Sequence, residues 1–155
     1  MSVLYFEVMS KDFDTWNIRK KTIDNNVSNQ KVYYHEKEVW WGNLGLNIGV
    51  ETDGKDEDFE RPVLIIKKFN SDMVWILPIT SKAKSDTFHY LLHHKSIKGS
   101  AILSQLRTIS TKRLSRKFGM ISQTDFNNIL LKVRDLIKIK SPLAGAFSEA
   151  EATNE

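Results

Sequence analysis

The stretch that decides the fold is RPVLIIKKFNSDMVWILPIT, residues 61–80, in which two apolar runs flank a short polar segment. The runs are rich in Val, Ile and Leu with Phe and Trp, a composition typical of β-strands. Asn70, Ser71 and Asp72 lie between them and favour a turn. Pro62 suits the first residue of a strand, where its missing N–H breaks no ladder hydrogen bond. We therefore expect a β-hairpin that begins at Pro62, with Arg61 on its rim.

Further segments of β-type composition lie on both sides of this hairpin, and turn residues separate them. Their short, regular spacing suits a small antiparallel sheet or barrel. The segments are residues 32–41, 87–92 and 100–110.

Two helices are expected to flank the strands. Asp12 or Asp14 can cap the first, in which Trp16 and Ile23 recur at near-helical spacing. The second spans about residues 122–140, where Ser122 and Asp125 resemble a capping box before an amphipathic apolar stripe. The predicted fold is mainly β with flanking helices, in the α+β class.

The chain is expected to hold one domain, because 155 residues suffice for one core of ordinary size. We predict a helical extension over residues 1–31, a domain over residues 32–141 and a disordered acidic tail over residues 142–155. The absence of cysteine excludes disulfides and thiolate metal sites. No signal-like or membrane-spanning run is present, so we expect a soluble cytoplasmic protein.

Charge is distributed unevenly along the sequence. The formal net charge is only +4, but residues 36–60 hold eight acids and two lysines, whereas residues 82–117 hold nine Lys or Arg and one acid. A basic half beside an acidic half is expected when one face meets phosphates. A solvated charged surface is the alternative interpretation.

Three segments together resemble one protein family. They are EVWWGNLGLNIGVETDGKDEDFERPVLIIKKFN (38–70), WILPITSKAK (75–84) and GSAILSQLRTISTKRLSRKFGMIS (99–122). In this order they are similar to the MazF/PemK toxins of type II toxin–antitoxin systems, over about residues 35–135. The resemblance implies a small SH3-like antiparallel β-barrel of the CcdB/MazF type that forms a homodimer. It also implies a cytoplasmic endoribonuclease that cleaves single-stranded RNA without metal or other cofactor, and an antitoxin that blocks its groove.

The resemblance places catalytic roles on Arg61 and Thr80. Metal-free cleavage uses the RNA 2′-hydroxyl to attack the adjacent phosphate, which leaves a 2′,3′-cyclic phosphate and a 5′-hydroxyl. A fixed guanidinium at Arg61 suits the charge of the phosphorane. The hydroxyls of Thr80 and Ser81 can donate to a non-bridging phosphate oxygen. A salt bridge between Arg61 and the loop acids remains the structural alternative.

A second group of residues is predicted to bind the substrate. Lys82 and Lys84 suit sequence-independent phosphate contacts, and Gln105 can read a base edge or orient Arg61. Arg107 either supports the fold or anchors the site. The group consists of Glu51, Ser81, Lys82, Lys84, Ser104, Gln105 and Arg107.

The sequence departs from the family pattern at three positions. Ser104 stands where some relatives carry an acid, Ile102 where some carry arginine, and Val50 where a histidine is usual. No proton acceptor is assigned, because a solvated glutamate such as Glu51 titrates at about 4 and is a weak base at neutral pH.

Two other functions stay open at this point. One is a CcdB-like toxin that binds and inhibits a gyrase-type protein, and the other is a catalytically inactive relative with a regulatory role. The pairing of Arg61 with Thr80 favours the nuclease, because a protein-inhibiting surface does not need it.

Overall fold

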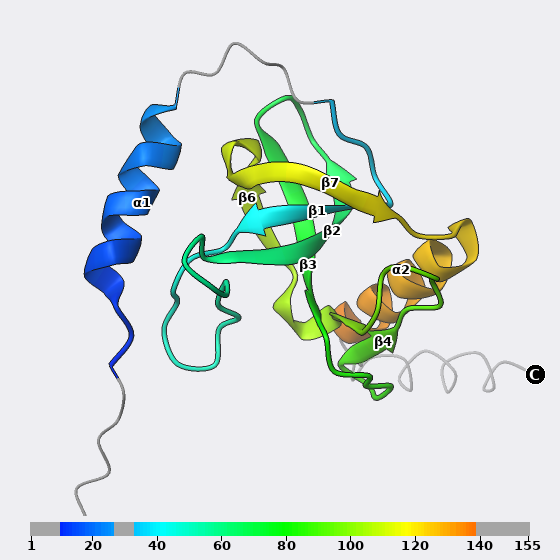
Figure 1. Cartoon of the computed structure of the whole chain (residues 1–155). Coiled ribbons are helices and arrows are strands. Elements are labelled where there is room, and N and C mark those ends of the chain that lie inside the picture. Colours follow the sequence, from blue (N-terminus) through cyan, green and yellow to red (C-terminus); the bar gives the residue numbers. More distant parts are fainter. Residues whose placement is uncertain (1–9, 27–32, 139–155) are drawn as a thin grey trace, which may run out of the picture.

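The structure, a computed structural model, describes residues 10–26 and 33–138. The described chain forms a strongly curved antiparallel sheet of seven strands with one helix on either side (Figure 1). The elements are α1 (Phe13–Asn25), β1 (Glu38–Asn43), β2 (Glu60–Lys68), β3 (Met73–Thr80), β4 (His89–Leu91), β5 (Ser100–Ile102), β6 (Arg107–Ser110), β7 (Leu114–Met120) and α2 (Gln123–Ile137). The predicted disordered tail, residues 142–155, lies outside the described residues, as do residues 1–9 and 27–32.

The strand order is β4-β5-β3-β2-β1-β7, and β6 also pairs with β3. The predicted hairpin is present: β2 and β3 pair antiparallel, with Val63 opposite Pro78. Within the described chain, β6 and β7 do not pair with each other. The sheet is therefore barrel-like but open between these two strands.

β2 and β3 are apolar on both faces because they separate two cores. Successive side chains of a strand point to opposite faces. One set packs inside the curve of the sheet, and the other packs between the sheet and α2. The inner core consists of Tyr34, Trp40, Leu44, Val63, Ile65, Val74, Ile76, Ile109 and Leu114. The outer core includes Leu64, Ile66, Leu77, Ile79, Phe126, Ile129 and Val133.

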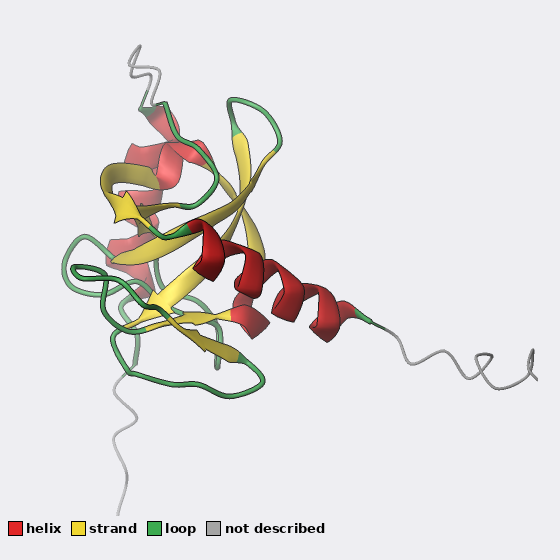
Figure 2. Ribbon diagram, turned by 90° about the vertical axis from the view of Figure 1, so that its right-hand side faces the viewer, coloured by secondary structure: helices red, strands yellow, loops and turns green. Residues whose placement is uncertain are grey.

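The two helices lie on opposite sides of the sheet, as Figures 1 and 2 both show. The predicted caps are confirmed: Asp12 Oδ1 accepts the Thr15 N–H at 2.9 Å, and Ser122 Oγ accepts the Asp125 N–H at 3.0 Å. Trp16 is the buried side chain of α1. No helix in the described part of the chain is long and apolar enough to cross a membrane.

Two parts of the strand prediction were wrong. The segment 100–110 is not one strand, because a 3₁₀ turn at Leu103–Gln105 separates β5 from β6. The expected first strand begins later than residue 32, at Glu38.

The strand β7 was missed, because its sequence LSRKFGM is polar and lacks a regular alternation. β7 is paired on β1, where its charges meet buried carboxylates: Arg116 contacts Glu60 at 2.6 Å and Lys117 contacts Glu38 at 2.5 Å.

The buried carboxylates Glu38 and Asp125 link stability to pH. Burial opposes ionisation of Glu38, but hydrogen bonds from Lys117 and Trp40 outweigh it and lower its pKa from the ordinary 4.5. Burial likewise opposes ionisation of Asp125, but hydrogen bonds from Tyr90 and His93 hold its pKa below the ordinary 3.8.

Because both pKa values are lower in the folded than in the unfolded state, the stabilisation is complete above about pH 4.5. We expect the free energy of unfolding to decline as the pH falls below that value and through the folded pKa values, as measured by urea titration between pH 7 and pH 3. The double variant Glu38→Gln/Asp125→Asn should show a flatter decline. An unchanged slope in that variant would contradict this assignment.

Candidate functional site

Arg61 and Thr80 lie together at one end of the sheet. The β2–β3 ladder ends at Val63 and Pro78, and Arg61 Nη1 donates to the Ile79 carbonyl at 3.3 Å, which places the guanidinium next to the residue that precedes Thr80. By strand alternation, both side chains leave the same face as the inner core, at its rim. The β2–β3 hairpin therefore brings the Arg61 guanidinium to the strand end that carries Thr80.

The guanidinium of Arg61 is held by backbone carbonyls. Its Nε donates to the Asp53 carbonyl at 2.6 Å and its Nη1 donates to the Ile79 carbonyl at 3.3 Å. Burial lowers the pKa of Arg61, and the nearby Asp53 carboxylate partly offsets this effect. Within the described residues no carboxylate lies within 4 Å of it, so the predicted salt-bridge alternative is absent there. The side chain is fixed in position but keeps its charge.

Among the described residues, the Thr80 hydroxyl has no acceptor for its proton. Its Oγ1 accepts the Lys82 N–H at 3.3 Å, and this bond uses an oxygen lone pair rather than the O–H donor. Ser81, the next residue, is exposed. A donor hydroxyl beside a fixed cation is an arrangement that suits an anionic oxygen.

The loop of residues 44–59, which joins β1 to β2, covers this end of the sheet (Figure 1). Gln105 fastens it: Oε1 accepts the Thr52 N–H at 3.2 Å, and Nε2 donates to the Val50 carbonyl at 3.4 Å. Glu51 is exposed, and its Oε2 accepts the Ile48 N–H at 3.2 Å. Gln105 thus holds the segment that leads to the Asp53 carbonyl, the acceptor for Arg61.

Two further arginines lie at the same end. Burial lowers the pKa of Arg107, with Glu51 opposing the effect, and burial together with the charge of Arg107 lowers the pKa of Arg113. Arg113 Nη1 donates to the Asn43 carbonyl at 2.8 Å, whereas the guanidinium of Arg107 makes no hydrogen bond or ion pair with any described residue. Three half-buried guanidinium groups thus contribute positive charge around the 44–59 loop.

Three residues of the predicted substrate-binding group do not contact the guanidinium groups of Arg61, Arg107 and Arg113 within the described residues. Lys82 and Lys84 are exposed on the chain that leaves β3, where the Lys84 N–H donates to Ser100 Oγ at 2.8 Å. Ser104 is exposed in the turn before Gln105. The structure records no contact between these three side chains and Arg61 within the described residues.

Sequence reasoning missed the contribution of the N-terminal segment to the loop. Lys11 Nζ lies 2.6 Å from an Asp53 carboxylate oxygen and donates to the Asn47 carbonyl at 2.6 Å. Trp16 packs against Phe59, with ring centroids 5.4 Å apart. Gly45 has a φ of +76°, and a Cβ there would lie 2.0 Å from the Trp16 ring. No sequence motif marks these contacts, because they join segments that only the tertiary fold brings together.

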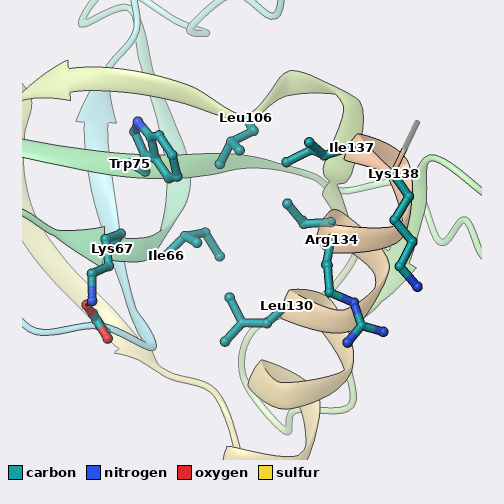
Figure 3. A pocket seen from close by; sticks show the side chains of 10 residues that line it. Ile66, Lys67, Trp75, Leu106, Leu130, Arg134, Ile137 and Lys138 are labelled. Atoms are coloured by element: carbon teal, nitrogen blue, oxygen red, sulfur yellow. Dashed lines mark ion pairs between the residues drawn. The ribbon is translucent and has the colours of Figure 1, made fainter. Parts of the chain in front are cut away.

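An apolar groove lies elsewhere, between α2 and the far halves of β2 and β3 (Figure 3). It has a volume of about 540 Å³, and Trp75, Leu106, Leu130 and Ile137 line it. Trp75 and Ile137 are 39% and 65% exposed. This groove lacks the cation and hydroxyl pairing of the Arg61 site, and its chemistry suits an apolar partner.

The described residues contain no group of three or more His, Cys, Asp or Glu side chains placed to hold a metal ion. The features at the Arg61 end are instead fixed guanidinium groups and a donor hydroxyl. Fold and site together define a small, barrel-like α+β protein with half-buried guanidinium groups gathered at one end of its sheet.

The chain belongs to the PemK-like, MazF-like toxin family of type II toxin–antitoxin systems, whose model matches residues 35–137. The family prediction is therefore confirmed. Among proteins with curated descriptions, none matches this sequence.

Solved structures with the same fold include MazF from Deinococcus radiodurans, at 16% identity and a TM-score of 0.56, covering 70% of this chain and 99% of that one. An endoribonuclease in complex with its cognate antitoxin, from a Mycobacterial species, is 14% identical with a TM-score of 0.55, covering 71% of this chain and 100% of that one. These similarities confirm the predicted MazF-type α+β fold. The helix α1 lies before the family match and is an addition to it.

Proposed function

We propose that this toxin-family chain is a metal-independent endoribonuclease that cleaves single-stranded RNA, such as mRNA. The observation that carries the proposal is the state of Arg61, whose guanidinium is fixed by two backbone carbonyls and not neutralised by a carboxylate. Preorganised charge aimed at a developing anion is usually the largest contribution to catalysis.

In the proposed reaction the RNA 2′-hydroxyl attacks the adjacent phosphorus, and the bond from phosphorus to the 5′-oxygen breaks. The 2′-hydroxyl loses its proton to a base and the departing 5′-oxygen gains one, which leaves a 2′,3′-cyclic phosphate and a 5′-hydroxyl. Arg61 stabilises the negative charge on the phosphorane, and the Thr80 hydroxyl donates to a non-bridging oxygen. Glu51, Ser81, Lys82, Lys84, Ser104, Gln105 and Arg107 are proposed to contact or position the substrate.

The proposed partners are single-stranded RNA, a cognate antitoxin and a second copy of the chain, in the cytoplasm. The antitoxin proposal is supported by the Mycobacterial neighbour, whose structure is a complex with its cognate antitoxin. The apolar groove beside α2 supports a protein partner, because exposed apolar surface of this kind is typical of interfaces.

Incubation of the purified protein with mixed RNA in excess chelator tests the proposed activity. We expect fragments that end in a 2′,3′-cyclic phosphate and begin with a 5′-hydroxyl, identified by mass spectrometry and by end-labelling. A toxin that inhibits a gyrase-type protein, or an inactive relative, would leave the RNA intact. Intact RNA after treatment at micromolar protein would therefore refute the nuclease assignment.

A further inference from the structure

A basic groove lies between α1 and the turn that joins β6 to β7. Its volume is about 350 Å³, at the lower end of the range for ligand pockets. The lining combines four cationic side chains with an aromatic ring and few acids. It consists of Trp16, Lys20, Lys21, Ile23, Asp24, Ser110, Lys112 and Arg113.

The positive charge of this groove is only partly neutralised. Asp24, the acid of the lining, lies 3.6 Å from Lys112, whose Nζ also donates to the Asp24 carbonyl at 2.7 Å. Lys20 and Lys21 are exposed and make no ion pair with any residue that the structure describes. Two uncompensated ammonium groups therefore border the groove, which favours an anionic ligand.

Arg113, which lines the groove, also contacts the Arg61 end of the sheet. The Arg113 guanidinium lies 5.6 Å from the centre of the Trp16 ring and donates to the Asn43 carbonyl. In the β1–β2 ladder, Asn43 lies opposite Glu60 and its neighbour Gly42 lies opposite Arg61. Arg113 therefore contacts β1 one residue away from the position that pairs with Arg61. Arg107 and Arg113 thus supply positive charge between the proposed cleavage site and α1.

Contacts of α1 and the residues just before it fix one wall of this groove. Lys11 is paired with Asp53, and Trp16 is 5% exposed beneath the 44–59 loop. Arg19 adds a contact at 3.5 Å with Asp58. Because the helix is anchored through these residues, Lys20 and Lys21 remain available, and a ligand meets a largely preformed site.

We propose that this groove binds a phosphate-bearing nucleotide of the RNA that flanks the cleavage position, which makes α1 an extension of the substrate site. The inference rests on the proposed nuclease function. Lys20 and Lys21 contact a phosphate, and the strand runs from Arg61 past Arg107 and Arg113 to reach them. Such contacts are independent of base sequence and sensitive to salt.

The test uses the double variant Lys20→Gln/Lys21→Gln and a 2′-O-methyl RNA 12-mer, which binds without being cleaved because it has no free 2′-hydroxyl. Each phosphate contact on a single strand contributes about 0.7 to the slope of log affinity against log salt. We expect the double variant to lose about 0.7 to 1.4 of this slope, with weaker binding at low salt. Lys20→Arg/Lys21→Arg should retain the wild-type slope.

Two controls separate a local effect from a general one. Lys132→Gln removes from α2, on the other side of the sheet, a positive charge that forms no ion pair with any described residue, and it should leave the slope unchanged. A dinucleotide with ordinary ribose, whose single phosphate is the one cleaved, has no flanking phosphate for Lys20 and Lys21 and should be cleaved equally by the wild type and the double variant.

The outcomes distinguish this inference from the proposed function. If the wild type cleaves RNA but the double variant keeps the full salt slope, the groove is not part of the RNA path and the inference is overturned. If the variant keeps RNA binding and instead loses affinity for the antitoxin, the groove binds protein and the inference is overturned as well. If the wild type neither binds nor cleaves RNA, the nuclease proposal itself has failed.

Discussion

Replacing Arg61 by alanine is expected to slow RNA cleavage by about 10²-fold or more, because it removes a preorganised donor from the developing phosphorane. The expected loss is mainly in kcat, since Lys82, Lys84 and Arg107 still supply positive charge for binding the ground state. Single-turnover cleavage of a labelled RNA at saturating protein measures this step directly.

The variant Arg61→Lys should also be impaired. An ammonium group keeps the charge but lacks the planar fork that donates to the Asp53 and Ile79 carbonyls while presenting further N–H groups to a phosphate. Arg134→Ala is the matched control, because Arg134 is an exposed arginine of α2 that contacts the adjacent Asp135. Retention of more than half of the wild-type rate in Arg61→Ala would exclude Arg61 from catalysis.

The largest expected effect on stability comes from Leu64→Ala. Leu64 is 0% exposed in the outer core, opposite Leu77 on β3 and Val39 on β1. The truncation leaves a cavity between the sheet and α2, and we expect the free energy of unfolding to fall by about 2–5 kcal/mol. Urea denaturation followed by tryptophan fluorescence measures the change.

The matched control for this prediction is Leu131→Ala. Leu131 is 47% exposed on α2, so its truncation should change the free energy of unfolding by no more than about 0.5 kcal/mol. Equal losses in the two variants would show that the outer core contributes less than its burial indicates.

The central hairpin could be predicted because its turn and its two apolar runs are local in the sequence, whereas the roles of Arg61 and Thr80 came from the family resemblance. A turn centred on Ser71 joins β2 and β3, but an irregularity between Ile65 and Lys67 shifts their register by one residue, and nothing in the sequence indicates that shift. The caps of α1 and α2 were equally local. In each, a side chain accepts a hydrogen bond from the N–H group three residues later in the sequence.

The remaining features depend on partners distant in sequence. The strand character of β7 comes from pairing with β1 and from carboxylates at Glu38 and Glu60, so its own composition does not indicate it. The carbonyl that holds Arg61 belongs to a loop whose shape is set by Gln105 and Lys11. Motif matching identified the arginine but could not identify what positions it.

The contact between Gly45 and Trp16 has a consequence for evolution. The indole occupies the volume that any side chain at position 45 would need, so the two positions cannot vary independently. Homologues that carry a bulkier residue at position 45 should lack the tryptophan or the whole N-terminal helix. Covariation between positions 16 and 45 in an alignment of homologues would therefore indicate which homologues carry the N-terminal helix.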